Sequence, residues 1–316
     1  MRMPCYPLRT LVLALATTTL GACSMIPTFE RPAAPVPASF AQSVASDAAG
    51  ANAGAAADTL AWRDYFADAR LREVIALALE NNRDLRIAAL NIERARAQYG
   101  IRQADLFPSV SAGGGQSAQR VPGDLNPSGD SVVSRQYSAN LGFASYELDF
   151  FGRVRSLEEQ ALQTYLGTEE ARRSAQISLV AEVANTWLRA AAARERLALA
   201  RSTFDTRKES LELTQRSFDA GAVSALDLHQ AETLLQTARA DAARYSAMLA
   251  QDENALALVV GAGVPAELRA TDLNQALVSV AVLPAGVPSE VLTRRPDVVQ
   301  AEYALRAANA NIGAAR

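Results

Sequence analysis

The residue types that catalyse reactions or bind metals are scarce in this chain of 316 residues, which contains one histidine and two cysteines. The histidine, His229, is close in sequence to Asp227 and Glu232, a grouping that permits a metal site but is more typical of a charged surface. Glu147 and Asp149 would share one face of an extended segment, but we expect them to form structural hydrogen bonds. No nucleophile elbow, phosphate-binding loop or paired-cysteine motif occurs in the sequence. An enzyme, a cofactor and a metal centre are therefore not predicted.

Chemistry of another kind is indicated at Cys23. Residues 1–22 carry two arginines and an apolar run at 11–16, which is typical of an export signal and too short to remain as a membrane-spanning helix. The signal ends in Leu-Gly-Ala-Cys at 20–23, which resembles the lipobox of bacterial lipoproteins. We therefore expect Cys23 to be acylated and to anchor the mature chain in outer-membrane lipid, with an ordinary secretory signal as the alternative. Removal of Cys5 with the signal would leave no partner for a disulfide.

The overall composition limits the classes of partner. The formal net charge is −3, which argues against a nucleic-acid partner and against polybasic attachment to a membrane. Hydrophobic residues make up 49% of the chain, and alanine is abundant over 160–260, where it favours closely packed helices. Residues 27–58 are instead rich in proline, alanine, serine and glycine. Since such a segment cannot bury enough surface to fold alone, we expect a tether up to about Trp62.

Hydrophobic periodicity predicts a helix followed by a strand hairpin. The helix covers 70–105, with a break at Asn81-Asn82 and an end before Pro108. Residues 107–119 and 135–150 predict two strands joined by a loop at 121–134. On the second strand, small polar residues alternate with an apolar set formed by Tyr137, Ala139, Leu141 and Phe143. This pattern suits a transmembrane β-barrel and equally an antiparallel sheet on a soluble core.

A long helical hairpin is predicted next. Residues 152–219 contain no proline and predict one helix of roughly 100 Å. An apolar residue recurs at every seventh position, which is typical of coiled-coil packing: Val183, Ala190, Leu197, Phe204, Leu211 and Phe218. Gly221 suits a left-handed helix end, and Ser224 with Asp227 resembles a capping box. A second helix to about 260 then completes the hairpin, with its tip at 219–225.

The C-terminal residues copy an earlier segment. Residues 84–103 align with 297–316 at a constant offset, with identities at Asp84/Asp297, Ala88/Ala301, Ala95/Ala308, Ala97/Ala310 and Gly100/Gly313. A repeat of this size predicts a duplicated fold. The first copy leads into the strand hairpin, whereas the second stops at Arg316, so we expect the sequence to be truncated within its second repeat.

Three motifs resemble those of one family, the TolC-like outer-membrane efflux factors of the NodT type. They are Tyr-Glu-Leu-Asp-Phe-Phe-Gly-Arg-Val-Arg at 146–155, Arg-Arg-Pro-Asp-Val at 294–298 leading into 308–313, and the tip from 216 onward. The resemblance covers 23–316 and implies a mainly α fold with a transmembrane β hairpin. In this family, a homotrimer forms an outer-membrane β-barrel continuous with a periplasmic α-barrel. It implies a passive conduit for drugs or other small solutes, which works with a periplasmic adaptor (membrane fusion) protein and an inner-membrane pump.

The resemblance and the periodicity together give an organisation along the chain. We expect a signal peptide at 1–22, a lipidated tether at 23–60, the first helices of repeat 1 at 61–106, the β hairpin at 107–151, the helical hairpin at 152–260, a connector at 261–290 and the start of repeat 2 at 291–316. The tip residues Gly221, Ser224, Leu226 and Asp227 are expected to contact the adaptor. The alternative is a structural coiled-coil outer-membrane lipoprotein without channel activity.

Overall fold

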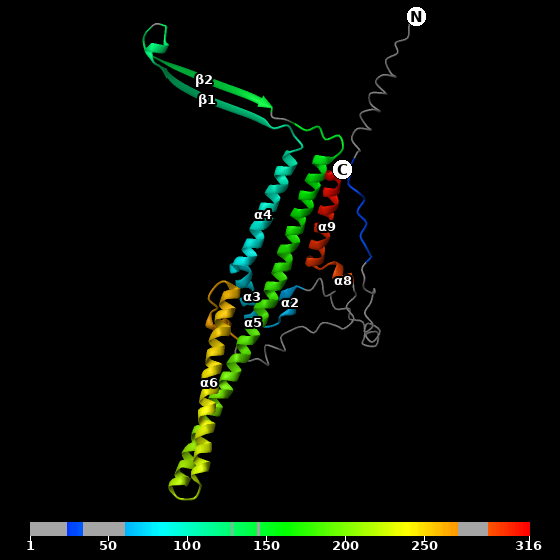
Figure 1. Ribbon diagram of the computed structural model, residues 1–316. Coiled ribbons are helices and arrows are strands. Elements are labelled where there is room, and N and C mark those ends of the chain that lie inside the picture. Colours follow the sequence, from blue (N-terminus) through cyan, green and yellow to red (C-terminus); the bar gives the residue numbers. More distant parts are fainter. Residues whose placement is uncertain (1–23, 34–60, 128, 144–145, 271–289) are drawn as a thin grey trace. The chain divides into compact units, whose positions relative to one another are not determined.

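The computed structural model describes residues 24–33, 61–127, 129–143, 146–270 and 290–316 (Figure 1). They divide into two units that are considered separately: a hairpin unit with residues up to 31, 93–167 and 302–316, and a helical unit with residues 32–92 and 168–301. In chain order the elements are α2 (Trp62–Tyr65), α3 (Ala69–Asn81), α4 (Arg83–Ala104), β1 (Val110–Val121), η2 (Gly123–Leu125), β2 (Val132–Phe143), α5 (Arg153–Asp219), α6 (Ala225–Val260), η3 (Ala266–Leu268), α8 (Glu290–Thr293) and α9 (Pro296–Ala315). The predicted signal and Cys23 lie outside the described residues.

The predicted strand hairpin is present, but its predicted bounds are wrong. The strands β1 and β2 pair antiparallel from Val110 opposite Phe143 to Val121 opposite Val132. The β-branched residues at 132 and 133 extend the ladder toward the loop, and Pro108 stays outside because it has no N–H to donate. The second strand ends before 146–149, where the polar side chains bond to the start of α5 instead.

In the described part of the hairpin unit, portions of α4, α5 and α9 and an N-terminal segment contact one another. Tyr99 on α4 stacks on Tyr165 on α5, with ring centroids 6.4 Å apart. Gly313 on α9 lies against Ser156 on α5 and against Ile26. Ile26 belongs to residues 24–31, here called the N-terminal strap, which also contacts α9 through Pro27 and Arg31. The strap is therefore held to a helix that lies almost 300 positions further along the sequence.

The hydrophobic core of the helical unit forms where α3 packs on α5 and α6. The apolar positions of α3 that set its helical period are all buried: Leu71, Val74, Ile75 and Ala78. They meet Trp187 of α5 and Val260 of α6, which are themselves buried. The indole Nε1 of Trp187 donates to the carbonyl of Leu268 at 2.9 Å, so its polar atom is satisfied inside the core.

Asn82 explains the predicted break between α3 and α4. Its side-chain Oδ1 accepts from the backbone N–H of Leu85 at 2.8 Å, which caps the start of α4. Its Nδ2 donates to the carbonyl of Val259 at 2.8 Å, so the break is also fixed to the end of α6. That end is closed by Gly261, which has the left-handed conformation with φ of 80°.

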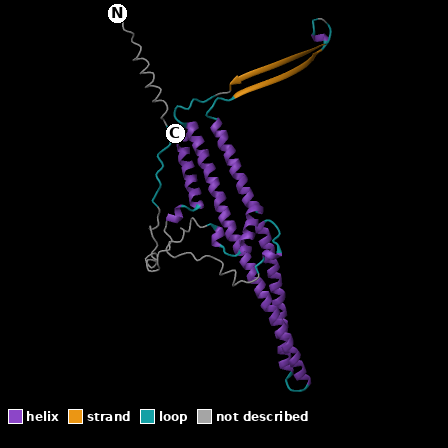
Figure 2. Cartoon of the chain, turned by 180° about the vertical axis from the view of Figure 1, so that it is seen from behind, coloured by secondary structure: helices purple, strands orange, loops and turns teal. Residues whose placement is uncertain are grey.

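The helices α5 and α6 form the predicted antiparallel hairpin, which Figure 2 shows from behind. The seven-residue stripe on α5 is buried at Val183, Ala190 and Leu197, whereas Phe218 near the tip is exposed. Burial is lost because, in this part of the chain, one partner helix covers only one side of the stripe. Within the described residues, no helix combines the length and the apolarity needed to cross a bilayer.

Candidate functional sites: strand hairpin, junction and helical tip

The tip of the helical hairpin is built on Gly221. This residue has φ of 74°, the left-handed conformation that the sequence predicts. Its N–H donates to the carbonyl of Phe218 at 2.8 Å, and the N–H of Ala222 donates to that of Ser217 at 2.8 Å, which satisfies the last turn of α5. A β-carbon at Gly221 would meet no atom within 4 Å. The need for glycine here is therefore conformational and not steric.

The predicted capping box follows directly. Ser224 Oγ accepts from the N–H of Asp227 at 3.3 Å, and the carboxylate of Asp227 accepts from the N–H of Ser224 at 3.0 Å. The hydroxyl of Ser224 also donates to this carboxylate, and these bonds hold the pKa of Asp227 below its ordinary value. Leu226, between them, is 66% exposed. The tip is therefore a fixed turn with one exposed apolar side chain, Leu226, beside an exposed carboxylate that caps the helix.

His229 lies near the start of α6, and its side chain contacts one carboxylate. Its Nδ1 is 2.9 Å from the carboxylate of Glu232, and both side chains are exposed. Among the described residues, no three His, Cys, Asp or Glu side chains are grouped closely enough to hold a metal ion. The interpretation of His229 as a surface residue in an exposed pair is the one that the geometry supports.

The strand hairpin has two chemically different faces. One face combines Phe143, Leu141, Ala139 and Tyr137 with their partners on β1, and the other carries serine, glycine, glutamine and asparagine. The apolar face is not packed on a core, because Phe143 is 80%, Leu141 78% and Tyr137 71% exposed. Sheets that rest on a soluble core bury their apolar face. This hairpin therefore needs apolar surroundings outside the described part of the chain.

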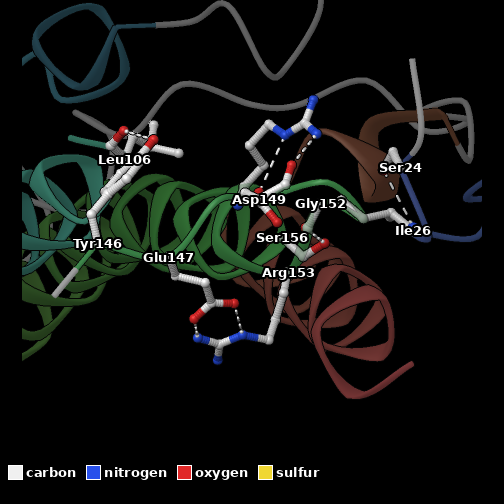
Figure 3. A network of polar contacts seen from close by, with 10 residues as sticks. Ser24, Ile26, Leu106, Tyr146, Glu147, Asp149, Gly152, Arg153 and Ser156 are labelled. Atoms are coloured by element: carbon white, nitrogen blue, oxygen red, sulfur yellow. Dashed lines mark hydrogen bonds and ion pairs between the residues drawn. The ribbon is translucent and has the colours of Figure 1, made fainter. Parts of the chain in front are cut away.

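The junction between the strands and α5 is held by two ion pairs (Figure 3). Arg153 Nε donates to Glu147 at 2.8 Å, and its second nitrogen bonds to the same carboxylate. The backbone N–H of Arg155 donates to Asp149 at 3.0 Å, and its guanidinium donates to the same carboxylate at 3.3 Å. Glu147 and Asp149 are therefore structural, as expected, although they lie in an irregular segment and not on a strand.

The surroundings of Asp149 lower the pKa of its carboxyl group. Burial by itself would raise the pKa of Asp149, but hydrogen bonds from Arg155 and from the backbone of Val154 and Arg153 bring that pKa below its ordinary value. The junction carboxylate is therefore ionised at neutral pH and receives the first N–H groups of α5, where the helix dipole also favours a negative charge.

The strap places the residue that follows Cys23 at this same junction. Ile26 and Ser156 at the start of α5 both lie against Gly313 of α9, and Ser24 Oγ accepts from the backbone N–H of Ile26 at 3.3 Å (Figure 3). Asn309 Nδ2 donates to the carbonyl of Pro27 at 2.8 Å, and Arg31 pairs with Glu302 at 3.0 Å. The predicted tether is thus ordered against α9 over its first residues, a contact that no local sequence pattern signals.

A cavity of about 200 Å³ lies in the helical unit beside Trp187. Its charged groups bond to one another. Glu253 pairs with Arg194 at 2.6 Å and with Arg269 at 3.3 Å, and Arg194 also donates to the carbonyl of Ala270. Since Glu253 pairs with both arginines, the cavity is lined by a structural polar cluster that ties α5, α6 and the segment after α6 together.

Comparison with known proteins places this architecture in a family. A family model described as outer membrane efflux protein matches residues 74–262, more than half of the chain. The chain belongs to this family. The matched region of this outer membrane efflux protein contains the strand hairpin, the junction, the tip and most of the helical core.

Relatives and solved structures agree with the assignment. TtgC of Pseudomonas putida, a probable efflux pump outer membrane protein, is 49% identical over 306 residues, which are 97% of this chain and 63% of the relative. The outer membrane protein OprJ of Pseudomonas aeruginosa is 45% identical over 100% of this chain and 64% of its own length. The chain thus spans somewhat less than two thirds of these relatives.

Two crystal structures illustrate the fold. A membrane protein from Pseudomonas aeruginosa matches with a TM-score of 0.76 and 43% identity, over 93% of this chain and 65% of that chain. The open state of the outer membrane channel MtrE of Neisseria gonorrhoeae matches with a TM-score of 0.73 and 39% identity, over 93% of this chain and 63% of that chain. The predicted TolC-like fold class is therefore confirmed.

Proposed function

We propose that this chain is part of the outer-membrane channel of a tripartite efflux pump, a passive conduit that exports drugs or other small solutes. The observation that carries the proposal is the strand hairpin, whose apolar face is exposed along its length while its other face is polar. Apolar surroundings on one side and water on the other are what a strand of a membrane channel meets. Family membership and the names of the relatives support the same function.

The proposal includes a lipid anchor and a defined orientation. Cys23 would carry acyl chains, and the docked strap would hold them next to the membrane end of α5. The loop between β1 and β2 would face the outside of the cell, and the helical tip would face the periplasm. A homotrimer with a periplasmic adaptor and an inner-membrane pump would complete the conduit.

The orientation is tested by labelling introduced cysteines from outside intact cells with a membrane-impermeant maleimide. Asp124→Cys in the external loop is expected to react, and Ser224→Cys at the tip is expected to react only after the outer membrane is opened. Both sites are exposed in the structure, so burial does not limit either reaction. Labelling of Ser224→Cys but not Asp124→Cys in intact cells would refute the proposed orientation.

The tip is proposed as the contact with the adaptor, through Gly221, Ser224, Leu226 and Asp227. Leu226→Ala tests the contact, and Leu199→Ala on α5 is a matched control because the two leucines are 66% and 69% exposed. We expect Leu226→Ala alone to reduce crosslinking to the adaptor and the rate of dye efflux in cells. Equal behaviour of the two variants would show that the tip only closes the helical hairpin.

A further inference from the structure

The apolar face of the strand hairpin ends in two arginines. Direct cross-strand partners lie on the same face of a sheet. The register pairs Ala118 with Arg135, two residues beyond the pair of Gln116 and Tyr137. It then pairs Arg120 with Val133, two residues further on. Arg120 and Arg135 therefore share the face of Tyr137, Leu141 and Phe143, at the end nearer the loop. The residues between them on the opposite face are uncharged: Ser117, Gln119, Ser134 and Gln136.

Both arginines are without an acidic partner in the part of the chain that the structure describes. Arg120 Nη2 donates only to the hydroxyl of Ser131, at 3.4 Å. No ion pair joins either guanidinium to a described carboxylate. Both side chains are exposed. Two uncompensated positive charges therefore stand on the face that carries the apolar residues.

Their level along the strands matches the edge of a hydrocarbon layer. From Phe143 to Arg135 the strand rises roughly 27 Å, or about 20 Å along the membrane normal at the usual tilt, which is close to the roughly 25 Å apolar band of outer-membrane strands. Tyr137 precedes the arginines, and its hydroxyl accepts from Gln116 Nε2 at 3.3 Å. An aromatic residue with a polar tip is typical of such an edge.

We propose that Arg120 and Arg135 bind the phosphate groups of a phosphorylated glycolipid in the outer leaflet of the membrane. The proposal rests on the proposed function, since it requires the hairpin to cross the outer membrane. The two positions are diagonal neighbours about 7–8 Å apart, so two guanidinium groups can bracket one phosphate. Arginine suits this role because its planar donors match phosphate oxygens in pairs. The apolar residues below them contact the acyl chains of the same lipid.

The test is native mass spectrometry of the detergent-extracted full protein, titrated with bis-phosphorylated lipid A, with dephosphorylated lipid A and with inorganic phosphate. We expect tight binding of the bis-phosphorylated lipid only. Each single change, Arg120→Gln or Arg135→Gln, is expected to weaken it about 5-fold, and both together about 30-fold. A relocated variant, Arg120→Gln with Gln119→Arg, keeps the net charge but moves one charge to the polar face, and should lose as much as Arg120→Gln.

Each outcome decides the proposal. If the relocated variant binds the bis-phosphorylated lipid as tightly as the unchanged protein, the face on which the arginine stands is irrelevant. If dephosphorylated lipid A or inorganic phosphate binds as tightly as the bis-phosphorylated lipid, the protein does not recognise the phosphate of the lipid. Either result overturns the proposal. Arg120→Lys and Arg135→Lys keep the charge and are expected to retain most of the affinity in correctly inserted protein. If cysteine labelling places the loop outside the cell while lipid binding is unaffected by all variants, the proposed function stands and this inference fails.

Discussion

Replacing Gly313 by alanine is expected to release the N-terminal strap from α9. A β-carbon at Gly313 would lie 2.7 Å from Ile26 Cγ1, 2.7 Å from Ser156 Oγ and 2.9 Å from the backbone nitrogen of Ile26. Side chains can rotate away, but the backbone nitrogen moves only if the strap moves. Gly100 is the equivalent residue of the first repeat, and a β-carbon there would meet nothing within 4 Å. Gly100→Ala is therefore the matched control.

The magnitude follows from two opposing effects. Alanine in place of glycine stabilises a helix interior by about 0.5–1 kcal/mol, and Gly100→Ala should gain this in full. At Gly313 the same gain is outweighed by forced displacement of packed atoms, which costs about 1–3 kcal/mol, and by strain on the hydrogen bond from Asn309 to Pro27. We expect a net local loss of about 1–2 kcal/mol at Gly313.

Amide hydrogen exchange measures this local free energy. A loss of 1–2 kcal/mol corresponds to exchange that is about 5–30 times faster in α9, with a parallel increase in protease cleavage of residues 24–31. In the Gly100→Ala variant, exchange in α4 should be unchanged or slower. If Gly313→Ala protects α9 as well as Gly100→Ala protects α4, the close packing of strap, α9 and α5 inferred from the structure is wrong.

Three further predictions concern the helix ends, the junction and the anchor. Gly221→Ala should cost about 1 kcal/mol, whereas Gly261→Ala should cost about 2–4 kcal/mol in urea unfolding followed by tryptophan fluorescence, because its β-carbon would also lie 2.5 Å from the carbonyl oxygen of Asn81. Since the pKa of Asp149 is lowered in the folded chain, the ionised carboxylate stabilises the fold fully above the ordinary pKa near 4, and this stabilisation is lost as the pH falls below it. An Asp149→Asn variant should lack this acid-dependent loss when the two proteins are compared by hydrogen exchange. Cys23→Ser should remove acylation, as read from the mass of the N-terminal peptide, and leave the circular dichroism unchanged.

Features that depend on neighbours in sequence were correctly predicted. The break at Asn81-Asn82, the left-handed Gly221 and the capping box of Ser224 and Asp227 are all present. Their signals are local, because a cap or a helix end is set by the residues within one turn. The alternation that puts Leu141 and its apolar neighbours on one strand face is equally local, since side chains alternate with period two. The sequence by itself therefore predicts which segments form helices and which form strands.

Strand bounds and burial were decided by the tertiary structure. The strand predicted to continue to 150 stops at Phe143, because Glu147 and Asp149 bond to arginines that are six residues further along the chain. The seven-residue stripe of α5 predicted packing over its full length, yet it is fully buried only at Val183, Ala190 and Leu197, and Phe218 near the tip is exposed. The arginines lie outside the predicted strand, and the helices that cover the stripe come from distant parts of the chain; periodicity locates neither.

The two copies of the internal repeat show the difference between local and tertiary effects, because the same residue types occur at equivalent positions in both. The sequence determined that both copies are helices, and both are, in α4 and α9. It did not determine which faces they bury: Gly100 is exposed and Gly313 is buried, and the alanine pair Ala97 and Ala310 differs in the same way. The physical reason is that helix formation is satisfied by hydrogen bonds within the segment, whereas burial requires a surface from elsewhere, and only α9 is covered by the strap.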